Sequence, residues 1–572
     1  MRLFLILLGL GARFCSTLVY STFVDSDTDE AAAKKYASEG FEIVFSDEFN
    51  TPDRQFKDGD DPTWTALDKN DYTNAALHYY KDTAVSTSDG MMKIKTDFGV
   101  NTFKAKNEKT GAFTRKNKYY TSGQVQTWNK FCFTGGIIEV SASPPGHPSI
   151  GGLWPAIWMM GNLARATYVG SSDWMWPWSY DECEEKNQES QLISKCAVNP
   201  HFDLLSHSGR GAPEIDIFEG MAGPSEKLPN TKIKKPYFST SLQVSPGVQN
   251  PRPVLTHKPL DGKWYEGMSY GTNSSLNNFF YGVQLKHTPE QYTYQSDAIS
   301  ANTAIEPKEY SRQHVFKVDW RPNDSITWYL DDVFLYKISQ PNLNITGSKI
   351  PDEPMYLILN TAISSTWGFP TKTDSCKCTS YDCSDPSCTC AFPTGFCDNI
   401  PSSFDVDWVR IYQHSEAINL GCSTKDKPTR KYIQGNEEKF KRPEDDVPIK
   451  SVRRGGGDCD VDGECGGGGK CDNGGCVCGE GYTGPMCLAE DKEYPGGTFL
   501  DETDETIEVE GVHLPAIFLG VMFLLVVVLV AACCKRVTER RERMGRYEYI
   551  KVGETEGYKS GGRYDRASSN RV

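Results

Sequence analysis

The feature that most constrains the fold is a succession of short apolar or alternating runs between turn residues, with no helical periodicity of about 3.6 residues sustained along them. Many positions in these runs hold β-branched or aromatic side chains, which are typical of strands. The runs occupy residues 41–45, 92–96, 137–142, 213–219, 240–244, 314–320, 325–330, 356–359 and 404–412. Many short strands without intervening helices form two packed sheets or a barrel, so we expect an all-β fold built on a large β-sandwich.

The tryptophans mark the extent of this sandwich, because all 12 lie between Trp64 and Trp408. The predicted organisation is a signal peptide (1–20), an N-terminal linker (21–40), the sandwich (41–435), a linker (436–458), a disulfide-rich module (459–487), an acidic stalk (488–512), a transmembrane helix (514–534) and a basic cytosolic tail (535–572). The chain of 572 residues therefore holds one large domain rather than several enzymes.

Both ends of the chain carry targeting signals. A basic start followed by a short apolar stretch over residues 3–10 is typical of a signal peptide and too short to span a bilayer. Residues 514–534 carry no charge and match a hydrocarbon core of about 30 Å. Acidic residues precede this span and basic residues follow it, which predicts a single-pass type I membrane protein. We expect the sandwich to lie on the lumenal or extracellular side, in the secretory pathway or at the cell surface. In the tail, the segment from Tyr547 to Ile550 resembles a tyrosine-based sorting signal, which predicts contact with the sorting machinery.

Charge and composition limit the partners. The formal net charge of −15 disfavours binding to nucleic acid, and the 19 cysteines indicate a disulfide-forming compartment. The histidines show no metal-ligand spacing, so we expect no metal and no cofactor, and a structural calcium is not indicated. Asn273, Asn323 and Asn344 each begin an N-glycosylation sequon.

Six cysteines follow the second linker within a stretch too small to build a hydrophobic core. They are Cys459, Cys465, Cys471, Cys476, Cys478 and Cys487. A zinc site is the alternative, but the absence of histidine here favours disulfides. The closing string CVCGEGYTGPMC (476–487) resembles an epidermal-growth-factor-like (EGF-like) module, and this resemblance implies first–third, second–fourth and fifth–sixth pairing.

The large domain holds ten further cysteines, an even number that suits complete pairing. Six of them crowd into residues 376–397, which the serine, aspartate and proline content marks as a loop. Cys183 and Cys196 bracket another loop and are expected to pair with each other. We interpret these cysteines as structural staples rather than catalytic thiols.

Three carboxylates at residues 214–219 form the candidate catalytic site. In a regular strand Glu214 and Asp216 share one face, whereas Glu219 points to the other. A one-residue bulge between Asp216 and Glu219 would bring all three to one face. Retaining glycoside hydrolysis needs a carboxylate nucleophile and a carboxylic acid on either side of the scissile bond, and neighbouring carboxylates raise one another's pKa.

Such a triplet also occurs by chance, and the alternative is a solvated acidic strand edge. Ile215 and Ile217 alternate with the acids, which indicates one polar and one packed face. Exposed aromatic rings are a natural platform for the apolar faces of sugars, although core packing explains some of the local aromatic residues. The candidate sugar-binding residues are Trp154, Trp158, Trp174, Trp176, Trp178 and Tyr180.

Longer strings resemble glycoside hydrolase family 16. These strings are VFSDEF (44–49), WPAIW (154–158), EIDIFE (214–219) and DVDWVRIYQ (405–413). Five further strings are similar to the β-glucan synthesis-associated branch of that family. They are GIIEVS (136–141), LWPAIWMMGNL (153–163), WPWSYD (176–181), GRGAPEID (209–216) and YQSDA (294–298). The resemblance covers about residues 41–435 and implies a concave β-jelly roll of the concanavalin A-like type, acting on β-glucans. It further implies Glu214 as nucleophile, Glu219 as acid/base, Asp216 as the residue that orients the nucleophile, and Trp154 and Trp158 as subsite walls. Gln243, a further candidate substrate-binding residue, stands where laminarinase-type members tend to carry a histidine.

We therefore expect a membrane-anchored retaining β-glucan glycosidase or transglycosylase, active in the assembly of β-1,6- or β-1,3-linked glucan of a cell wall or store. The alternative is a non-catalytic glucan-binding or adhesion receptor with a lectin-like sandwich. Three aligned carboxylates repel one another and serve no purpose in a binding module, which favours the enzyme.

Overall fold

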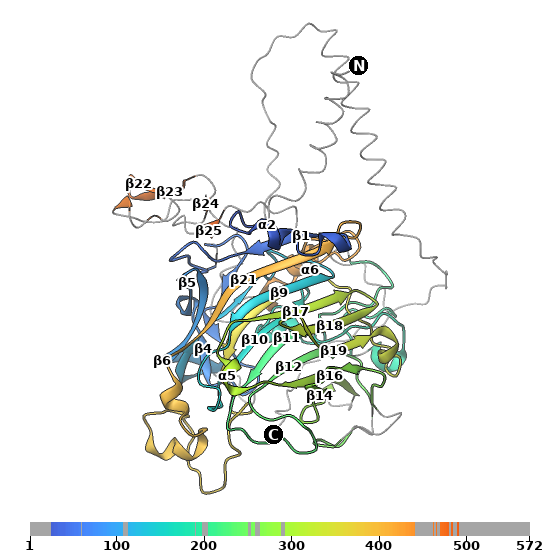
Figure 1. The fold of residues 1–572 in the computed structure, drawn as a ribbon. Helices are drawn as coiled ribbons and strands as arrows, with labels where there is room; N and C mark the ends of the chain where they lie inside the picture. The colour runs from blue at the N-terminus through green and yellow to red at the C-terminus, as the bar shows by residue number, and fades with distance from the viewer. Residues whose placement is uncertain are drawn as a thin grey trace.

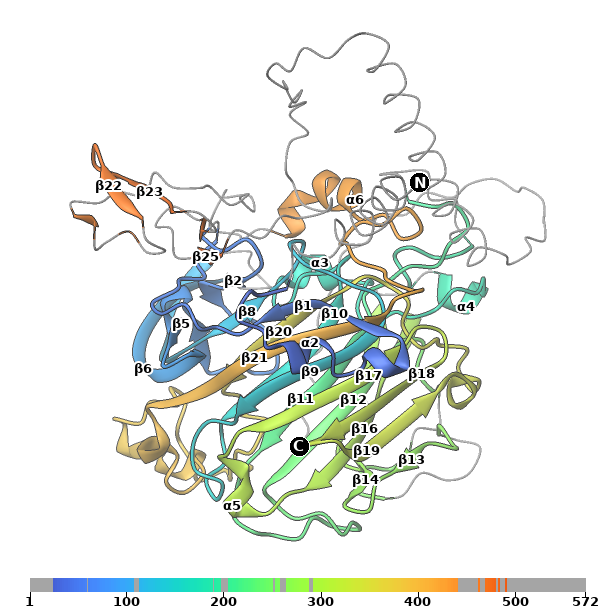
Figure 2. The same cartoon turned by 45° about the horizontal axis from the view of Figure 1, so that its top comes forward.

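Two stacked β-sheets make up the body of the protein (Figures 1 and 2). The computed structural model describes residues 24–440 apart from 59, 107–112, 189, 197–203, 250–252, 258–263 and 288–291, together with short stretches between 461 and 490. All the predicted runs lie in strands, namely β1, β6, β9, β11, β12, β17, β18, β20 and β21. The predicted all-β sandwich is confirmed.

Among the described residues the first sheet has 12 strands and the second has 9. The first runs in the order β13 (Ser269–Tyr270), β19 (Val333–Ser339), β18 (Ser325–Leu330), β17 (His314–Arg321), β9 (Gly136–Ser143), β21 (Ser402–His414), β6 (Met91–Lys106), β7 (Phe113–Ser122), β4 (His78–Tyr80) and β3 (Lys69–Asn70), with β1 (Phe41–Asp47) on β21 and β5 (Val85–Ser88) on β6. The second runs β14 (Ser274–Leu276), β16 (Tyr292–Ala304), β12 (Tyr237–Val244), β11 (Glu214–Met221), β10 (Trp154–Gly161), β20 (Met355–Ala362), β8 (Gln124–Gln126) and β2 (Thr65–Ala66), with β15 (Val283–His287) on β16.

The core lies between the sheets because each strand presents one apolar face to the other sheet. In β17, Phe316, Val318 and Trp320 are buried, while Lys317 and Asp319 alternate with them and are partly exposed. The second sheet contributes Ile215 and Ile217 from β11 to the same cluster. The opposite face of β11, which carries the acids, is therefore directed away from the core.

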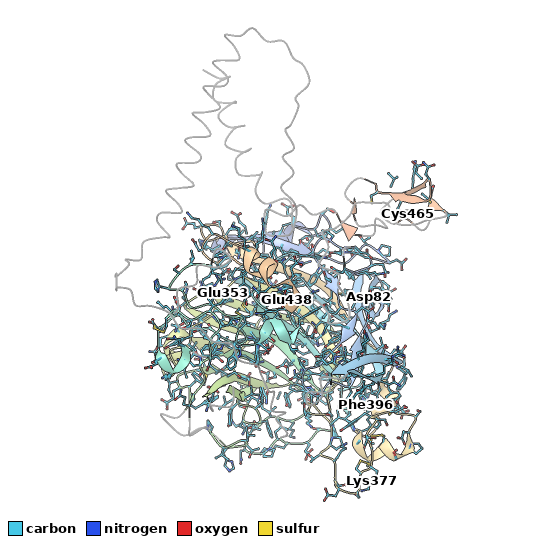
Figure 3. The ribbon with its side chains drawn as sticks, turned by 180° about the vertical axis from the view of Figure 1, so that it is seen from behind. Asp82, Glu353, Lys377, Phe396, Glu438 and Cys465 are labelled. Carbon is cyan, nitrogen blue, oxygen red and sulfur yellow. A yellow bond between two sulfur atoms is a disulfide. The ribbon has the colours of Figure 1, made fainter. Side chains whose placement is uncertain are left out.

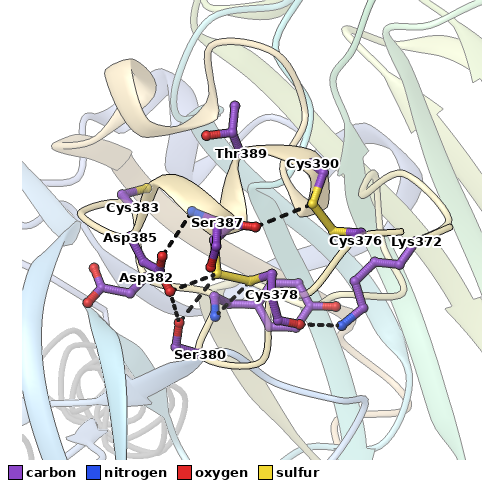
Figure 4. The surroundings of a disulfide bond; sticks show 12 residues. Lys372, Cys376, Cys378, Ser380, Asp382, Cys383, Asp385, Ser387, Thr389 and Cys390 are labelled. Carbon is purple, nitrogen blue, oxygen red and sulfur yellow. Dashed lines mark hydrogen bonds between the residues drawn. A yellow bond between two sulfur atoms is a disulfide. The ribbon is translucent and has the colours of Figure 1, made fainter. Parts of the chain in front are cut away.

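Disulfides join distant parts of the domain. Cys132 and Cys422 bridge a sequence separation of 290 residues, and the predicted Cys183–Cys196 pair is confirmed. Three more bridges, Cys376–Cys390, Cys378–Cys388 and Cys383–Cys397, lie within the loop between β20 and β21. We call residues 376–397 the disulfide knot; it projects from the sandwich in Figure 1 and appears in close-up in Figure 4.

The N-terminal linker prediction is wrong for residues 24–40, which pack on the sandwich. Glu139 in β9 is buried and needs a counter-charge. Lys35 Nζ lies 2.6 Å from the Oε1 atom of Glu139, and the Tyr36 hydroxyl donates to the same oxygen at 2.6 Å.

The described α-helices are all short. They are α2 (Glu30–Ala33), α3 (Val169–Ser172), α4 (Glu185–Gln188), α5 (Pro307–Tyr310) and α6 (Arg430–Gly435).

The domain also extends past the predicted boundary at residue 435. Phe440 is buried and stacks on Trp128 with ring centroids 5.1 Å apart. Within the part of the chain that the structure describes, no helix has the length and apolar character needed to cross a membrane. The predicted signal peptide (1–20), transmembrane helix (514–534) and cytosolic tail (535–572) lie outside the described residues, as do the stalk from residue 491 onward and the sorting signal.

The disulfide-rich module is described in pieces. Strands β22 (Lys470–Asp472) and β23 (Gly475–Val477) form an antiparallel pair, as do β24 (Tyr482–Thr483) and β25 (Ala489–Glu490). The implied second–fourth bridge, Cys465–Cys476, is confirmed. Cys471 and Cys478 are also disulfide-bonded, whereas Cys459 and Cys487 lie outside the described residues.

The three sequon asparagines are exposed on the sandwich surface. Asn273 lies just before β14, Asn323 in the turn between β17 and β18, and Asn344 after β19. A glycan at any of these positions avoids the sheets, and their glycosylation stays a prediction.

Candidate active site

The three carboxylates share the outer face of β11 because of a β-bulge. Asp216 pairs with Ser241 of β12 and Glu219 pairs with Ser239, so three steps along β11 match two along β12. Ile217 and Phe218, the residues between, are both buried in the core. Glu219 thereby returns to the face of Glu214 and Asp216, and the predicted bulge is confirmed.

An indole from the other sheet contacts this bulge. Trp328, fully buried in β18, donates its Nε1–H to the backbone carbonyl oxygen of Asp216 at 2.9 Å. A bulge interrupts the regular pairing of a strand, and a buried carbonyl without a partner costs free energy. Trp328 therefore stabilises the backbone conformation that aligns the three acids.

Each carboxylate has its own set of hydrogen-bond donors. Glu214 accepts from Gln243 Nε2 and from Trp176 Nε1, both at 2.6 Å. Asp216 accepts from the Ser241 hydroxyl and, at 3.2 Å, from Gln243 Nε2. Glu219 accepts from Trp154 Nε1 at 2.9 Å. Glu214 thus has two N–H donors and Glu219 has one, and each N–H favours the ionised form of the carboxylate that it contacts.

Burial and mutual repulsion shape the proton affinity of the site. Burial, followed by the charge of Asp216, raises the pKa of Glu219 well above its usual value, and the Trp154 N–H partly opposes this rise. The same two causes raise the pKa of Glu214, against the N–H of Trp176. Burial also raises the pKa of Asp216, which its donors Ser241 and Gln243 oppose. These shifts all favour the protonated form, which suits a site for general acid catalysis.

Three of the predicted sugar-binding tryptophans lie beside the acids. Trp154, Trp158 and Trp176 are all half-buried, and so is Gln243. Trp154 and Trp176 donate to Glu219 and Glu214, while Trp158 donates its Nε1–H to Asn360 Oδ1 at 2.8 Å. The structure therefore brings these rings to the carboxylates and leaves part of each accessible.

The prediction that Trp174, Trp178 and Tyr180 form an exposed sugar platform is wrong. Trp178 has 0% of its side chain exposed, Tyr180 5% and Trp174 8%. The three side chains pack together as a small apolar cluster, with Trp178 and Tyr180 ring centroids 6.5 Å apart. Apolar surface that is already buried in the fold cannot stack on a ligand.

Four site residues escaped the sequence patterns: Ser241, Asn360, Trp328 and Trp367. Asn360 in β20 lies in register with Ala156 of β10, which pairs in turn with Glu219, and it donates to the Tyr80 hydroxyl at 3.3 Å. A polar residue directly after the apolar run 356–359 was the available signal for Asn360.

No group of three or more histidine, cysteine, aspartate and glutamate side chains in the described ranges is arranged to hold a metal ion.

Comparison with known proteins assigns the chain to a family. The family model described as "Beta-glucan synthesis-associated protein SKN1/KRE6/Sbg1" matches residues 13–376 and 396–445. Beta-glucan synthesis-associated protein KRE6 of Candida albicans is 34% identical over 440 residues, which are 72% of this chain and 51% of the relative. KRE6 of Saccharomyces cerevisiae is 32% identical over 444 residues, 74% of this chain and 54% of the relative.

The laminarinase catalytic domain from Thermotoga maritima MSB8 is among the similar solved structures, with 19% identity, a TM-score of 0.34, and coverage of 66% of this chain and 99% of that one. The chain spans about half the length of the curated relatives it matches. Because the family model matches well over half of its residues, the chain belongs to the beta-glucan synthesis-associated SKN1/KRE6/Sbg1 family.

Proposed function

We propose that this protein is a membrane-anchored, retaining β-glucan glycosidase or transglycosylase that acts in β-glucan assembly. The observation that carries the proposal is the bulge in β11, which aligns Glu214, Asp216 and Glu219 on one face with a different donor set for each. The family supports a role in β-glucan synthesis. The anchor rests on the apolar segment 514–534, and a lumenal or extracellular sandwich accords with its five disulfides.

In the first step a carboxylate oxygen of Glu214 attacks the anomeric carbon of a glucosyl unit. The glycosidic C–O bond breaks, and Glu219 gives its proton to the departing sugar oxygen. Asp216, which shares the Gln243 amide with Glu214, orients the nucleophile. The product is a glucosyl ester on Glu214, with Glu219 left ionised.

In the second step an acceptor hydroxyl attacks the same carbon from the opposite face. Glu219 takes the proton of that hydroxyl, and the ester bond to Glu214 breaks. Water as the acceptor gives hydrolysis, whereas a sugar hydroxyl gives a longer or branched glucan.

Incubating the full chain with end-labelled β-1,3- and β-1,6-linked gluco-oligosaccharides distinguishes these outcomes. We expect labelled products both shorter and longer than the donor, because a glucosyl ester formed beside aromatic rings can pass to a second sugar. Mass spectrometry of the labelled products measures this. Products that are only shorter contradict transfer, and no product from either series contradicts the enzyme.

The pH profile reports on the Trp154–Glu219 hydrogen bond. Trp154→Phe removes an N–H that stabilises the ionised form of Glu219, so the pKa of Glu219 rises further. The acid must be protonated in the first step, and the basic limb of kcat/KM therefore moves to higher pH, by roughly one unit for a charged hydrogen bond. Trp158→Phe is the control, because its indole donates to Asn360 and not to a carboxylate. A basic limb that stays in place in Trp154→Phe assigns the acid to another residue.

A further inference from the structure

Most of the disulfide knot lies outside the residues that the family model matches. The family model matches residues 13–376 and 396–445 and omits the segment between them. The knot, residues 376–397, carries three disulfides within 22 residues of chain, and Cys378 and Cys388 are buried. Figure 4 shows the dense local network, in which Lys372 Nζ donates to the Cys378 carbonyl at 2.9 Å.

The knot is joined to the sandwich through aromatic side chains. Phe396 at its inner end is 1% exposed, and its ring centroid lies 5.1 Å from that of Phe369 and 5.4 Å from that of Phe392. The Tyr120 hydroxyl of β7 donates to the carbonyl of Tyr381 at 2.8 Å. In Figure 3 Phe396 lies on the side of the knot toward the sandwich and Lys377 at its outer end.

Phe369 is two residues from Trp367, which lies against the candidate active site. The Trp367 and Trp154 rings are stacked, with centroids 4.3 Å apart and planes 5° from parallel. Trp367 also donates its Nε1–H to the carbonyl of Gly220, the residue after Glu219, at 3.1 Å. Both indoles are half-buried. The two rings therefore form one aromatic wall, residues Trp154 and Trp367, next to Glu219.

A second contact links the knot to the same wall. Gly152 has φ +110°, and a Cβ atom there would lie 2.5 Å from a ring carbon of Phe396 and 3.1 Å from one of Phe369. The backbone that enters β10 at Trp154 therefore runs directly against these two rings. Phe396 and Phe369 thus support Trp154 through their contact with the backbone at Gly152. They also support Trp367, because Phe369 follows it by two residues along the chain.

We propose that the disulfide knot is a specificity element, which holds the Trp154–Trp367 wall in place as a binding surface for the apolar faces of β-linked glucosyl units. This inference rests on the proposed function for its ligand class. The part of the stacked indole pair that remains exposed presents flat C–H-accepting π surface, which suits a pyranose ring and not an anion. Trp367 is then a sugar-contacting residue, and the knot residues are positioning residues that act through it.

The test measures binding of β-1,3- and β-1,6-linked glucohexaose to the full chain by calorimetry. Trp367→Ala removes half of the wall, and replacing Cys376, Cys378, Cys388 and Cys390 by serine releases the outer part of the knot. We expect each change to weaken binding of the preferred hexaose about tenfold, with KM rising and kcat within about twofold. Combined, they weaken binding by less than the product of the two separate effects, because both act on one wall.

The matched control is Cys183→Ser with Cys196→Ser, which opens a loop of similar sequence separation, 13 against 14 residues, elsewhere in the domain. Phe369→Ala, which leaves every cysteine paired, replaces the serine variants if these do not fold. Knot variants that bind as tightly as the control overturn the inference and leave the proposed function intact. Intact binding with no turnover of any glucan overturns the proposed catalysis alone, and a chain that binds neither hexaose overturns both.

Discussion

Replacing Glu214 by glutamine is expected to lower β-glucan turnover by at least about 10⁴-fold and to leave glucan binding within a few-fold. The amide keeps the shape of the side chain and its place between Gln243 and Trp176 but cannot attack the anomeric carbon. Initial rates and calorimetric affinities on the full chain measure the two quantities. Glu226→Gln, an exposed carboxylate on the loop after β11, is the control and should leave both unchanged.

A second variant set separates the roles of the two glutamates. With an aryl β-glucoside, which needs no acid to leave, azide should restore activity to both Glu214→Ala and Glu219→Ala. Azide fills the space left at Glu214 and attacks the sugar directly, which gives the α-glycosyl azide. In Glu219→Ala the ester on Glu214 still forms, and azide then gives the β-glycosyl azide. The opposite configurations would exchange the two roles, and full turnover of Glu214→Gln would favour a different nucleophile.

Removing the Cys132–Cys422 disulfide is expected to have the largest effect on stability. The bridge closes a loop of 290 residues, and the chain-entropy model assigns about 6 kcal/mol of the unfolding free energy to a loop of this length. Replacing both cysteines by alanine should shift urea unfolding to a much lower midpoint and increase its slope, because the unfolded chain without the bridge is less compact and exposes more surface. Alanine is chosen because both sites are 1% exposed, and serine would bury two hydroxyl groups.

The Cys183–Cys196 pair provides the comparison, because it closes only 13 residues and the same model assigns it about 3 kcal/mol. The difference between the two double variants therefore isolates the effect of loop length. Equal losses for the two pairs would show that loop closure does not account for the contribution of the long bridge.

The strands that alternate in hydropathy were predictable from the sequence, and the others were not. β17 alternates cleanly because one face meets the core and the other meets water. In β16 the residues that face away from the core, such as Ser300 and Asn302, are polar although buried, so no alternation of exposure marks the strand. β7 is rich in lysine, arginine and tyrosine at the sheet periphery and also lacks the pattern.

Within the candidate site, what could be predicted was local in sequence. Glu214, Asp216 and Glu219 can share one face of a strand only if a bulge lies between Asp216 and Glu219, and that bulge is present. The supporting residues come from far along the chain: Trp328 lies 112 positions from Asp216, Trp367 147 from Gly220 and Asn360 202 from Trp158. Spacing also cannot separate an exposed ring from a buried one, which is why Trp178 was misassigned.

The long disulfide determines what a single backbone cut does to the domain. Residues 132–422 form a covalent ring that contains the three acids, Gln243 and every aromatic residue of the candidate site. A protease cuts most readily at exposed loop tips, such as residues 224–227 in the loop after β11. One such cut opens the ring but leaves its two parts joined through Cys132 and Cys422. After a nick there, β11 with the three acids and β12 with Gln243 stay in one molecule, whereas the same nick would leave them on separate pieces of an unbridged chain.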